Sequence, residues 1–352
     1  YQAIDSAKKY IYLQSYIFQN DHVGKQFIER MAAKAKQGVK VRILYDDVGC
    51  WRFWFHRNFF NEMRKHNIQI EPFIPNKFPI LGGKLNYRNH RKIVVIDGYI
   101  GYTGGINIGD EYLGMNKKFG YWRDTHIKIT GLAVAELQKR FFLDWHNATK
   151  EDLNYQPKYF PLMEDKEGFG DVAVQIVASG PDQTDEIIKQ NYLKLINSAQ
   201  ESILIQTPYF IPDSSVMEAL KISAASGVDV RIMIPNKPDH LFVYWATYYN
   251  VGVLLNYGVK VYTYEKGFLH AKTLVVDGTV STVGTANFDM RSFKLNFEII
   301  AIIYDSLKSA ELKNSFEDDT KYSLQITPEL YMQRGFTIRI KESISRLLSA
   351  IL

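Results

Sequence analysis

The sequence predicts an α/β fold made of two tandem domains. The main support is a repeat: HRKIVVIDGYIGYTGGIN at 90–107 returns as HAKTLVVDGTVSTVGTAN at 270–287, at a constant offset of 180 (270 − 90 and 287 − 107). The flanking sequence returns as well, because IDSAKKYIYLQSYIF at 4–18 resembles INSAQESILIQTPYF at 196–210. In both halves strand-like and helix-like stretches alternate, which favours parallel strands joined by crossover helices.

The composition is that of a folded protein with room for two hydrophobic cores. The chain has 352 residues, of which 46% are hydrophobic and 23% are charged, which excludes a largely disordered protein. The net charge of +5 would suit an anionic partner but is weak support for one. The single cysteine, Cys50, excludes an internal disulfide framework and a cysteine-rich zinc site. No apolar run approaches the roughly 18 residues that a membrane-spanning helix needs.

The first half is predicted to alternate strands and helices. YIYLQSYIF is apolar enough for a strand, and the helical periodicity that follows it stops at Gly38. The elements are expected as strand 10–18, helix 22–37, strand 39–46, strand 68–73, strand 123–130 and helix 131–146. The second half is expected to contain strand 171–179, helix 182–200, strand 297–304 and helix 305–320.

A polar segment without periodicity separates the two halves. Residues 151–170 are rich in polar residues, Pro and Gly and are predicted to form a linker. The first domain is therefore expected at 1–150 and the second at 171–352. The amphipathic tail, 336–352, is expected to be a final helix, either docked on the core or lying on a membrane surface.

The second half opens with a strand and a helix that have almost no counterpart in the first half. Strand 171–179 has none, and helix 182–200 corresponds only to the segment just after the N-terminus. We therefore expect the first domain to lack its N-terminal strand and most of a helix, so that the sequence is part of a longer chain. A membrane anchor is then expected upstream of Tyr1.

The repeated motif predicts a β-hairpin in each half. Asp-Gly between two apolar runs favours a two-residue turn at Asp97 and Gly98. Facing residues then have numbers that sum to 195, which places His90 opposite Gly105 and puts Asn107 on the same face. The second copy gives the same arrangement with a sum of 555. A bulge would change this register.

The shared face carries side chains that suit a phosphodiester. A lysine supplies positive charge and an asparagine donates hydrogen bonds, and both stabilise charge that builds on phosphate oxygens. A histidine can be the nucleophile in one copy and the general acid in the other. The candidate catalytic residues are His90, Lys92, Asn107, His270, Lys272 and Asn287, and Asp97 and Asp277 complete the motif as turn-formers and anchors.

Two further acidic residues are candidates for supporting the histidines. Glu298 lies in an otherwise apolar strand, where a charge is costly without a partner. We expect it to fix the tautomer of His270 and to stabilise its protonated form. Asp124 lies in the equivalent region of the first half and is the matching candidate for His90.

Two copies of H-x-K-x4-D-x6-G-x2-N resemble the paired HKD motifs of the phospholipase D superfamily. The resemblance covers nearly the whole chain. Within that superfamily, TPYFIPD at 207–213, GFLHAKT at 267–273 and SFKLNFE at 292–298 resemble segments of bacterial cardiolipin synthases, as does the terminal RLLSAIL. Many members carry Ser after the motif glycine. Thr285 keeps that hydroxyl, whereas Gly105 does not, so a phosphate contact from the first half is expected to be lost.

The resemblance implies two phospholipase D-like α/β/α sandwich domains related by a pseudo-twofold axis. It implies a cardiolipin synthase that converts two phosphatidylglycerols to cardiolipin and glycerol through a phosphatidyl-histidine, without a metal or other cofactor. His90 is then the expected nucleophile and His270 the general acid. The expected partners are phosphatidylglycerol and an anionic membrane surface, without nucleic acid, at the bacterial cell membrane. The sequence does not indicate an oligomeric state.

Two aromatic segments are candidates for lipid contact. They would line an acyl-chain groove or lie at a lipid interface, where Trp, Tyr and Arg are favoured. Core packing is the alternative for both segments. The candidates are Trp51, Trp54, Phe55 and Arg57 in the first half and Tyr244 and Trp245 in the second.

Two other functions compete with lipid transfer. A hydrolase on the same scaffold, either a phospholipase or a nuclease, would use water in place of the alcohol acceptor. A lipid-binding protein without activity would need a broken motif, and both copies retain His, Lys, Asp and Asn.

Overall fold

The computed structural model describes residues 1–50, 58–75, 86–153, 156, 159–161 and 170–348. The chain forms two compact units. The first contains Tyr1–Met115 and His126–Asp171, and the second contains Asn116–Thr125 and Val172–Leu352. Most of the predicted linker, 151–170, lies outside the described residues.

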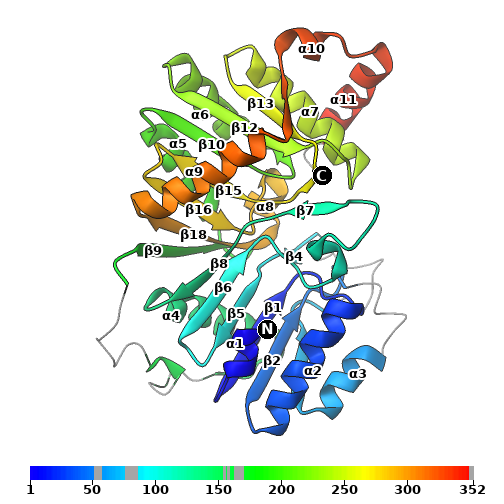
Figure 1. Cartoon of the computed structure of the whole chain (residues 1–352), viewed down its shortest axis with the longest axis vertical. Coiled ribbons are helices and arrows are strands. Elements are labelled where there is room, and N and C mark those ends of the chain that lie inside the picture. Colours follow the sequence, from blue (N-terminus) through cyan, green and yellow to red (C-terminus); the bar gives the residue numbers. More distant parts are fainter. Residues whose placement is uncertain (51–57, 76–85, 154–155, 157–158, 162–169, 349–352) are drawn as a thin grey trace. The chain divides into compact units, whose positions relative to one another are not determined.

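A six-stranded sheet forms the centre of the first unit (Figure 1). Its order is β3 (Ile68–Pro72), β2 (Lys40–Tyr45), β1 (Tyr10–Ser15), β5 (Ile93–Ile96), β6 (Ile100–Gly104) and β8 (His126–Thr130). The first three strands run parallel, as the strand–helix–strand pattern predicted. The other three are antiparallel, because the motif hairpin supplies two of them.

Helices cover both faces of this sheet. On one face α1 (Gln2–Ser6), α2 (His22–Lys36) and α3 (Asn58–Lys65) share a core with Ile11 and Leu13 of β1. On the other face lies α4 (Ala133–Thr149), where Phe141 stacks on Tyr12, with ring centroids 4.9 Å apart. Successive side chains of a strand point to opposite faces, so β1 contributes to both cores. The unit is an α/β/α sandwich.

The second unit repeats this sheet and extends it at both edges. The order is β19 (Ser323–Ile326), β13 (Lys260–Tyr264), β12 (Asp229–Pro235), β10 (Ser202–Gln206), β15 (Thr273–Val276), β16 (Val280–Gly284) and β18 (Asn296–Tyr304), with β9 (Ala173–Ser179) paired to β18. β10, β12 and β13 run parallel, and the hairpin β15–β16 is antiparallel. The predicted second copy of the fold is therefore confirmed.

The helices of the second unit are layered in the same way. Ile203 and Ile205 share a core with α5 (Ile187–Ser198), α6 (Ser214–Ala225) and α7 (Leu241–Leu255). Leu204 points to the opposite face, where it clusters with Phe316 of α9 (Ser306–Thr320). The remaining elements are β4 (Arg88–Asn89), η2 (Asp110–Leu113), β7 (Tyr121–Arg123), β11 (Phe210–Ile211), β14 (Gly267–Leu269), β17 (Phe288–Asp289), α8 (Met290–Lys294), α10 (Pro328–Met332) and α11 (Phe336–Leu348).

The strand predicted at 123–130 is wrong as one element. It breaks after Arg123, so that β7 pairs in parallel with β14 in the second unit while β8 joins the sheet of the first. The break has a local cause, because the carboxylate of Asp124 accepts the N–H of Thr125 at 2.7 Å. That N–H is then unavailable for continuing the strand ladder.

Helix ends follow the chemistry of their sequence. α2 begins after Asp21, whose carboxylate accepts the N–H of Gly24 at 2.9 Å, and it stops just before Gly38, which has a φ of 90°.

Throughout the described ranges, no helix is both long enough and apolar enough to span a bilayer.

Candidate active site

Each motif forms the predicted hairpin turn, but the predicted register is wrong by one residue. Tyr99 N donates to Ile96 O at 3.1 Å, and φ is positive at both Asp97 (53°) and Gly98 (76°). The strands then pair Ile96 with Ile100, so that facing numbers sum to 196. In the second hairpin the numbers of facing residues sum to 556, whereas 555 was predicted. One extra residue after each turn acts as the bulge that would change the register.

Each motif lysine bends back over the histidine that precedes it by two residues. Lys92 Nζ donates to the carbonyl oxygen of His90 at 2.8 Å, and Lys272 Nζ donates to that of His270 at 2.5 Å. Both lysines are buried, at 2% and 1% exposure. In each copy the ammonium group is therefore tied to the backbone of the motif histidine.

The motif aspartates anchor backbone at the far end of the hairpin. Asp97 accepts three successive N–H groups, at 8–10, at 2.7 to 2.8 Å. Asp277 accepts the matching three, at 200–202, at 2.8 to 2.9 Å. Burial raises the pKa of Asp277, but these hydrogen bonds outweigh it and the net shift is downward. Both residues lie in the turn with positive φ and hold three backbone N–H groups of the neighbouring segment.

The motif asparagines are buried and partly used for structure. Asn107 Oδ1 accepts the N–H of Ile17 at 3.2 Å. Asn287 Nδ2 donates to Asp289 at 3.1 Å, while its Oδ1 has no hydrogen-bond partner among the described residues. Asp289 also accepts the N–H of Ser292 at 2.6 Å, and burial raises its pKa to about 6.

His270 is paired with Asp124, which corrects the expected assignment of both supporting carboxylates. Nδ1 of His270 lies 2.7 Å from Asp124 Oδ2. Burial raises the pKa of Asp124, but the charge of His270 and this hydrogen bond lower it by more, so the net shift of the pKa is downward. Asp124 is therefore a carboxylate that can accept Nδ1–H of His270. The prediction that Asp124 serves His90 is wrong.

Glu298 does not hold Nδ1 of His270 as expected. Its carboxylate is fully buried and accepts from Asn296 Nδ2 at 3.1 Å, while its other oxygen lies 2.5 Å from Oγ1 of Thr285. The Thr285 hydroxyl also accepts the N–H of Ile299 at 2.9 Å. Thr285 thus supports the buried carboxylate of Glu298.

Burial changes the charge balance at Lys272. It lowers the pKa of the ammonium to about 8, and the nearby charges of Asp124 and Glu298 offset part of that effect. A bound phosphate would stabilise the buried ammonium, because its negative charge offsets the cost of burying a positive one, whereas the neighbouring carboxylates oppose its binding.

Tyr16, just after β1, contacts His90, and Asp46, just after β2, contacts the two residues that precede it. The imidazole meets Tyr16 edge to face, with ring centroids 4.9 Å apart. Asp46 fixes the approach to the motif, because it accepts the N–H of Asn89 at 2.8 Å and lies 3.4 Å from the Arg88 guanidinium. The sequence interpretation missed Tyr16, Asp46 and Asp289. The polar end of strand 39–46 was the available signal for Asp46.

The tentative lipid-contact residues are only partly described. Trp51, Trp54, Phe55 and Arg57 lie outside the described residues. Tyr244 and Trp245 lie on α7 and are half-buried, with ring centroids 5.1 Å apart. Lys341 Nζ of α11 lies 5.5 Å from the Trp245 ring. Both aromatic side chains therefore have packing contacts.

Each motif thus supplies an imidazole, an ammonium and a carboxamide from the segments that flank its hairpin. This set can bind a phosphate, neutralise its developing charge and exchange a proton or a covalent bond with it. In the described parts of the chain, no group of three or more His, Cys, Asp and Glu is arranged to hold a metal ion.

The fold and the two motifs define a phospholipase D-like protein. The chain belongs to the family described as cardiolipin synthase, PLD-like domain, which matches residues 1–145 and 192–320. The resemblance seen in the motifs is confirmed.

Two bacterial relatives illustrate the similarity. The major cardiolipin synthase ClsA of Bacillus subtilis (strain 168) is 53% identical over 350 residues, covering 99% of this chain and 72% of that protein. A cardiolipin synthase of Listeria welshimeri is 50% identical over 350 residues, with the same coverage of 99% and 72%.

Solved structures share the fold at low sequence identity. Phosphatidylserine synthase of Haemophilus influenzae Rd KW20 has a TM-score of 0.72 at 16% identity, covering 99% of this chain and 89% of that one. Polyphosphate kinase of Porphyromonas gingivalis has a TM-score of 0.57 at 14% identity, covering 99% and 50%. At such identities the likeness concerns the fold alone.

Proposed function

We propose that this protein is a phosphatidyltransferase that makes cardiolipin from two molecules of phosphatidylglycerol and releases glycerol. The observation that carries the proposal is the presence of two complete His–Lys–Asn sets on repeated hairpins, in a chain 53% identical to a cardiolipin synthase. A transfer through a covalent intermediate needs one nucleophile and one proton carrier, and the two histidines supply them.

In the first step His90 attacks the phosphorus of one phosphatidylglycerol. A bond forms between imidazole nitrogen and phosphorus, and the bond from phosphorus to the glycerol oxygen breaks. Nε2–H of the protonated His270 gives its proton to that oxygen. The lysines and asparagines stabilise the charge on the non-bridging oxygens.

In the second step His270 acts as the base. Nε2 takes the proton from a glycerol hydroxyl of the second phosphatidylglycerol, and that oxygen attacks the phosphatidyl-histidine. The nitrogen–phosphorus bond breaks, cardiolipin is formed and His90 is regenerated. Asp124 stabilises the protonated form of His270 in both steps through the 2.7 Å contact at Nδ1.

The products made from phosphatidylglycerol vesicles test this function. Cardiolipin plus glycerol is the expected result. Phosphatidic acid plus glycerol would mean that water is the acceptor and that the protein is a hydrolase. Cleavage of DNA without any turnover of lipid would refute a lipid substrate.

The order of the histidines has its own test. With a phosphatidyl substrate that carries a good leaving group, His270→Ala should still acquire a lipid label slowly, whereas His90→Ala should not. Label on His90→Ala protein and none on His270→Ala protein would reverse the assignment.

A second partner in this proposal is an anionic membrane surface. The protein would bind it through α11, at the bacterial cell membrane. The apolar residues Phe336, Ile340, Ile344 and Leu347 lie along one face of α11 and are 42% to 82% exposed. The opposite face carries the buried Glu342 and Ser345, at 2% and 1% exposure, together with the half-buried Ile338. This helix therefore presents its apolar face outward.

The charges around this face favour an anionic bilayer. Arg339, Lys341 and Arg346 are exposed on the flanks of the apolar face. Long basic side chains beside an apolar face can reach lipid headgroups while the apolar side chains enter the acyl boundary. Phosphatidylglycerol would then be both the substrate and a component of the membrane surface that α11 binds.

Vesicle flotation tests this surface. The double variant Ile340→Ser, Ile344→Ser should bind phosphatidylglycerol vesicles several-fold more weakly than the unaltered protein. Leu307→Ser is the control, because Leu307 is 77% exposed on α9. Equal binding by all three proteins would rule out α11 as the membrane contact.

A further inference from the structure

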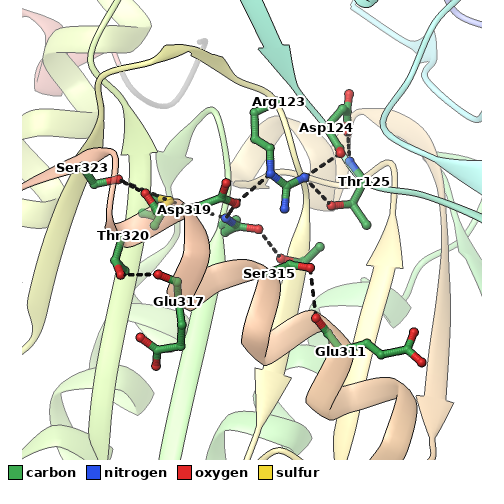
Figure 2. A network of polar contacts seen from close by, with 12 residues as sticks. Arg123, Asp124, Thr125, Glu311, Ser315, Glu317, Asp319, Thr320 and Ser323 are labelled. Carbon is green, nitrogen blue, oxygen red and sulfur yellow. Dashed lines mark hydrogen bonds and ion pairs between the residues drawn. The ribbon is translucent and has the colours of Figure 1, made fainter.

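A largely buried arginine–carboxylate network joins β7, β10 and α9 of the second unit (Figure 2). Arg123 Nε donates to Asp319 Oδ2 of α9 at 2.7 Å, and the two side chains are only 13% and 10% exposed. Gln206 Nε2, at the end of β10, donates to the same oxygen at 2.8 Å. Charge-assisted hydrogen bonds of this kind fix an arginine in one orientation.

The other arm of the same guanidinium holds the backbone beside His270. Arg123 Nη1 donates to the carbonyl oxygen of Asp124 at 2.6 Å and to Thr125 Oγ1 at 3.1 Å (Figure 2). The carbonyl oxygen of Arg123 in turn accepts the N–H of His270 at 2.7 Å. Arg123 therefore joins α9, the Asp124 backbone and the motif backbone.

Both oxygens of the Asp124 carboxylate have fixed partners as a result. Oδ1 accepts the N–H of Thr125 at 2.7 Å, and Oδ2 lies 2.7 Å from His270 Nδ1. The direction of the carboxylate is set by the backbone at 124 and 125, and Arg123 holds that backbone. A displacement of Arg123 would therefore reach His270 through Asp124.

The first unit contains the same three chemical groups in an equivalent place. Gln14 of β1 donates to Asp144 of α4 at 2.8 Å, and Arg91 donates to both oxygens of Asp144 at 2.8 Å. Gln14 and Gln206 are equivalent in the repeat at 4–18 and 196–210. Each unit thus buries a glutamine, an aspartate and an arginine between its sheet and the helix on that face.

The source of the arginine differs between the units. Arg91 is the middle residue of the first His-x-Lys, whereas the second motif has Ala271 at that position (271 − 91 = 180). Ala271 has no charged side chain, and Arg123 supplies the guanidinium from β7. Because this arginine comes from β7, the next residue in the chain is Asp124, which pairs with His270.

We infer that Arg123, anchored by Asp319 and Gln206, is a positioning residue that holds Asp124 in line with His270 for proton transfer. It acts through Asp124 and does not contact the reacting atoms. The inference rests on the proposed role of His270 as acid and base. Orientation of that imidazole is what allows a positioned acid to contribute its typical 10²–10⁴-fold to the rate.

The leaving group distinguishes a positioning role from a general structural one. Arg123→Lys should lower kcat for phosphatidylglycerol about 10- to 100-fold with little change in KM, because the glycerol oxygen needs a proton. With a nitrophenol leaving group, which departs without a proton, release of nitrophenol in the first turnover should fall less than threefold. Asp319→Asn should have the same leaving-group dependence, and circular dichroism confirms that each variant is folded.

Two controls complete the experiment. Asp144→Asn alters the matched network of the first unit and should show no selectivity for the leaving group. In an Asp124→Ala background, Arg123→Lys should cause no further loss, because both changes act on one path. Equal losses with both leaving groups, or additive losses in the double variant, would overturn the inference.

The result can be separated from failure of the proposed function. Release of nitrophenol reports the first step whether lipid or water is the final acceptor. A wild-type protein that forms only phosphatidic acid would refute cardiolipin synthesis, yet the leaving-group comparison would still test Arg123.

Discussion

Asp124 Oδ2 lies 2.7 Å from Nδ1 of His270, although the two residues are 146 positions apart in the chain. The carboxylate comes from a ten-residue segment of the first half, 116–125, that packs as part of the second unit. The supporting carboxylate of the second motif therefore comes from a residue that precedes the predicted linker, 151–170.

Asp124→Asn should abolish most of the activity and leave the fold intact. Asparagine can keep the hydrogen bond to Thr125 N, but it lacks the charge that stabilises protonated His270. We expect kcat/KM for phosphatidylglycerol to fall about 10²-fold. Thermal unfolding should show a folded protein. Full activity in this variant would show that Asp124 has no part in proton transfer.

Activity should fall as the pH rises through about 8, where Lys272 loses its proton. The ammonium is needed to stabilise the phosphate, so this decrease, the alkaline limb of the pH profile, should appear in kcat/KM, which reports the free enzyme. Lys272→Arg stays charged, and its remaining activity should lack this limb. An unchanged limb in that variant would assign it to another group.

Stability should change in the opposite direction over the same pH range. The pKa of Lys272 is lowered from 10.5 to about 8 in the folded protein. Between these values the unfolded chain binds more protons, so this group makes the free energy of unfolding rise with pH. Urea denaturation at pH 7.5 and about 9.5, for Lys272→Met against the unaltered protein, isolates the contribution.

Asp277→Ala should destabilise the second unit without changing the leaving-group dependence of the reaction. The substitution leaves three backbone N–H groups at 200–202 without their carboxylate. Losing such charge-assisted bonds costs about 1–3 kcal/mol. Urea denaturation measures it. Because the pKa of Asp277 is lowered on folding, the difference from wild type should shrink as the pH falls through that pKa.

The two turn glycines form a matched pair for a steric test. Gly98 and Gly278 both have positive φ, at 76° and 64°. A Cβ at Gly98 would lie 2.7 Å from Pro161 Cδ and 2.7 Å from the Tyr10 hydroxyl, whereas one at Gly278 meets only Lys313 at 3.6 Å. Gly98→Ala should therefore lower the melting temperature more than Gly278→Ala. Equal shifts would mean that backbone strain alone matters.

The repeat made most of the fold predictable. A constant offset between two motifs, with strand–helix units around them, was enough to predict two copies of one sheet. The position of Asp97 and Asp277 away from the histidine was also predicted from sequence, because side chains alternate along a strand and Asp97 falls on the face opposite His90.

What the sequence could not supply depended on single backbone hydrogen bonds and on long-range pairing. The observed register differs from the predicted one by one residue because Tyr99 follows the turn as an extra residue. No composition rule predicts that bulge. The pairing of Asp124 with His270 depends on β7 joining β14, which symmetry between the halves argued against. Arg123 was missed because its equivalent in the first unit, Arg91, lies inside the motif.

The placement of β7 has a consequence for anyone who wishes to divide this chain. A cut in the 151–170 segment yields a C-terminal fragment without β7, Arg123 and Asp124, and an N-terminal fragment that carries them without β14 to pair with. Fragments expressed separately would leave the second motif unfinished, and mixing them would require strand addition to restore it. Gene fusions, split reporters and circular permutants should therefore keep 116–125 covalently joined to the second half.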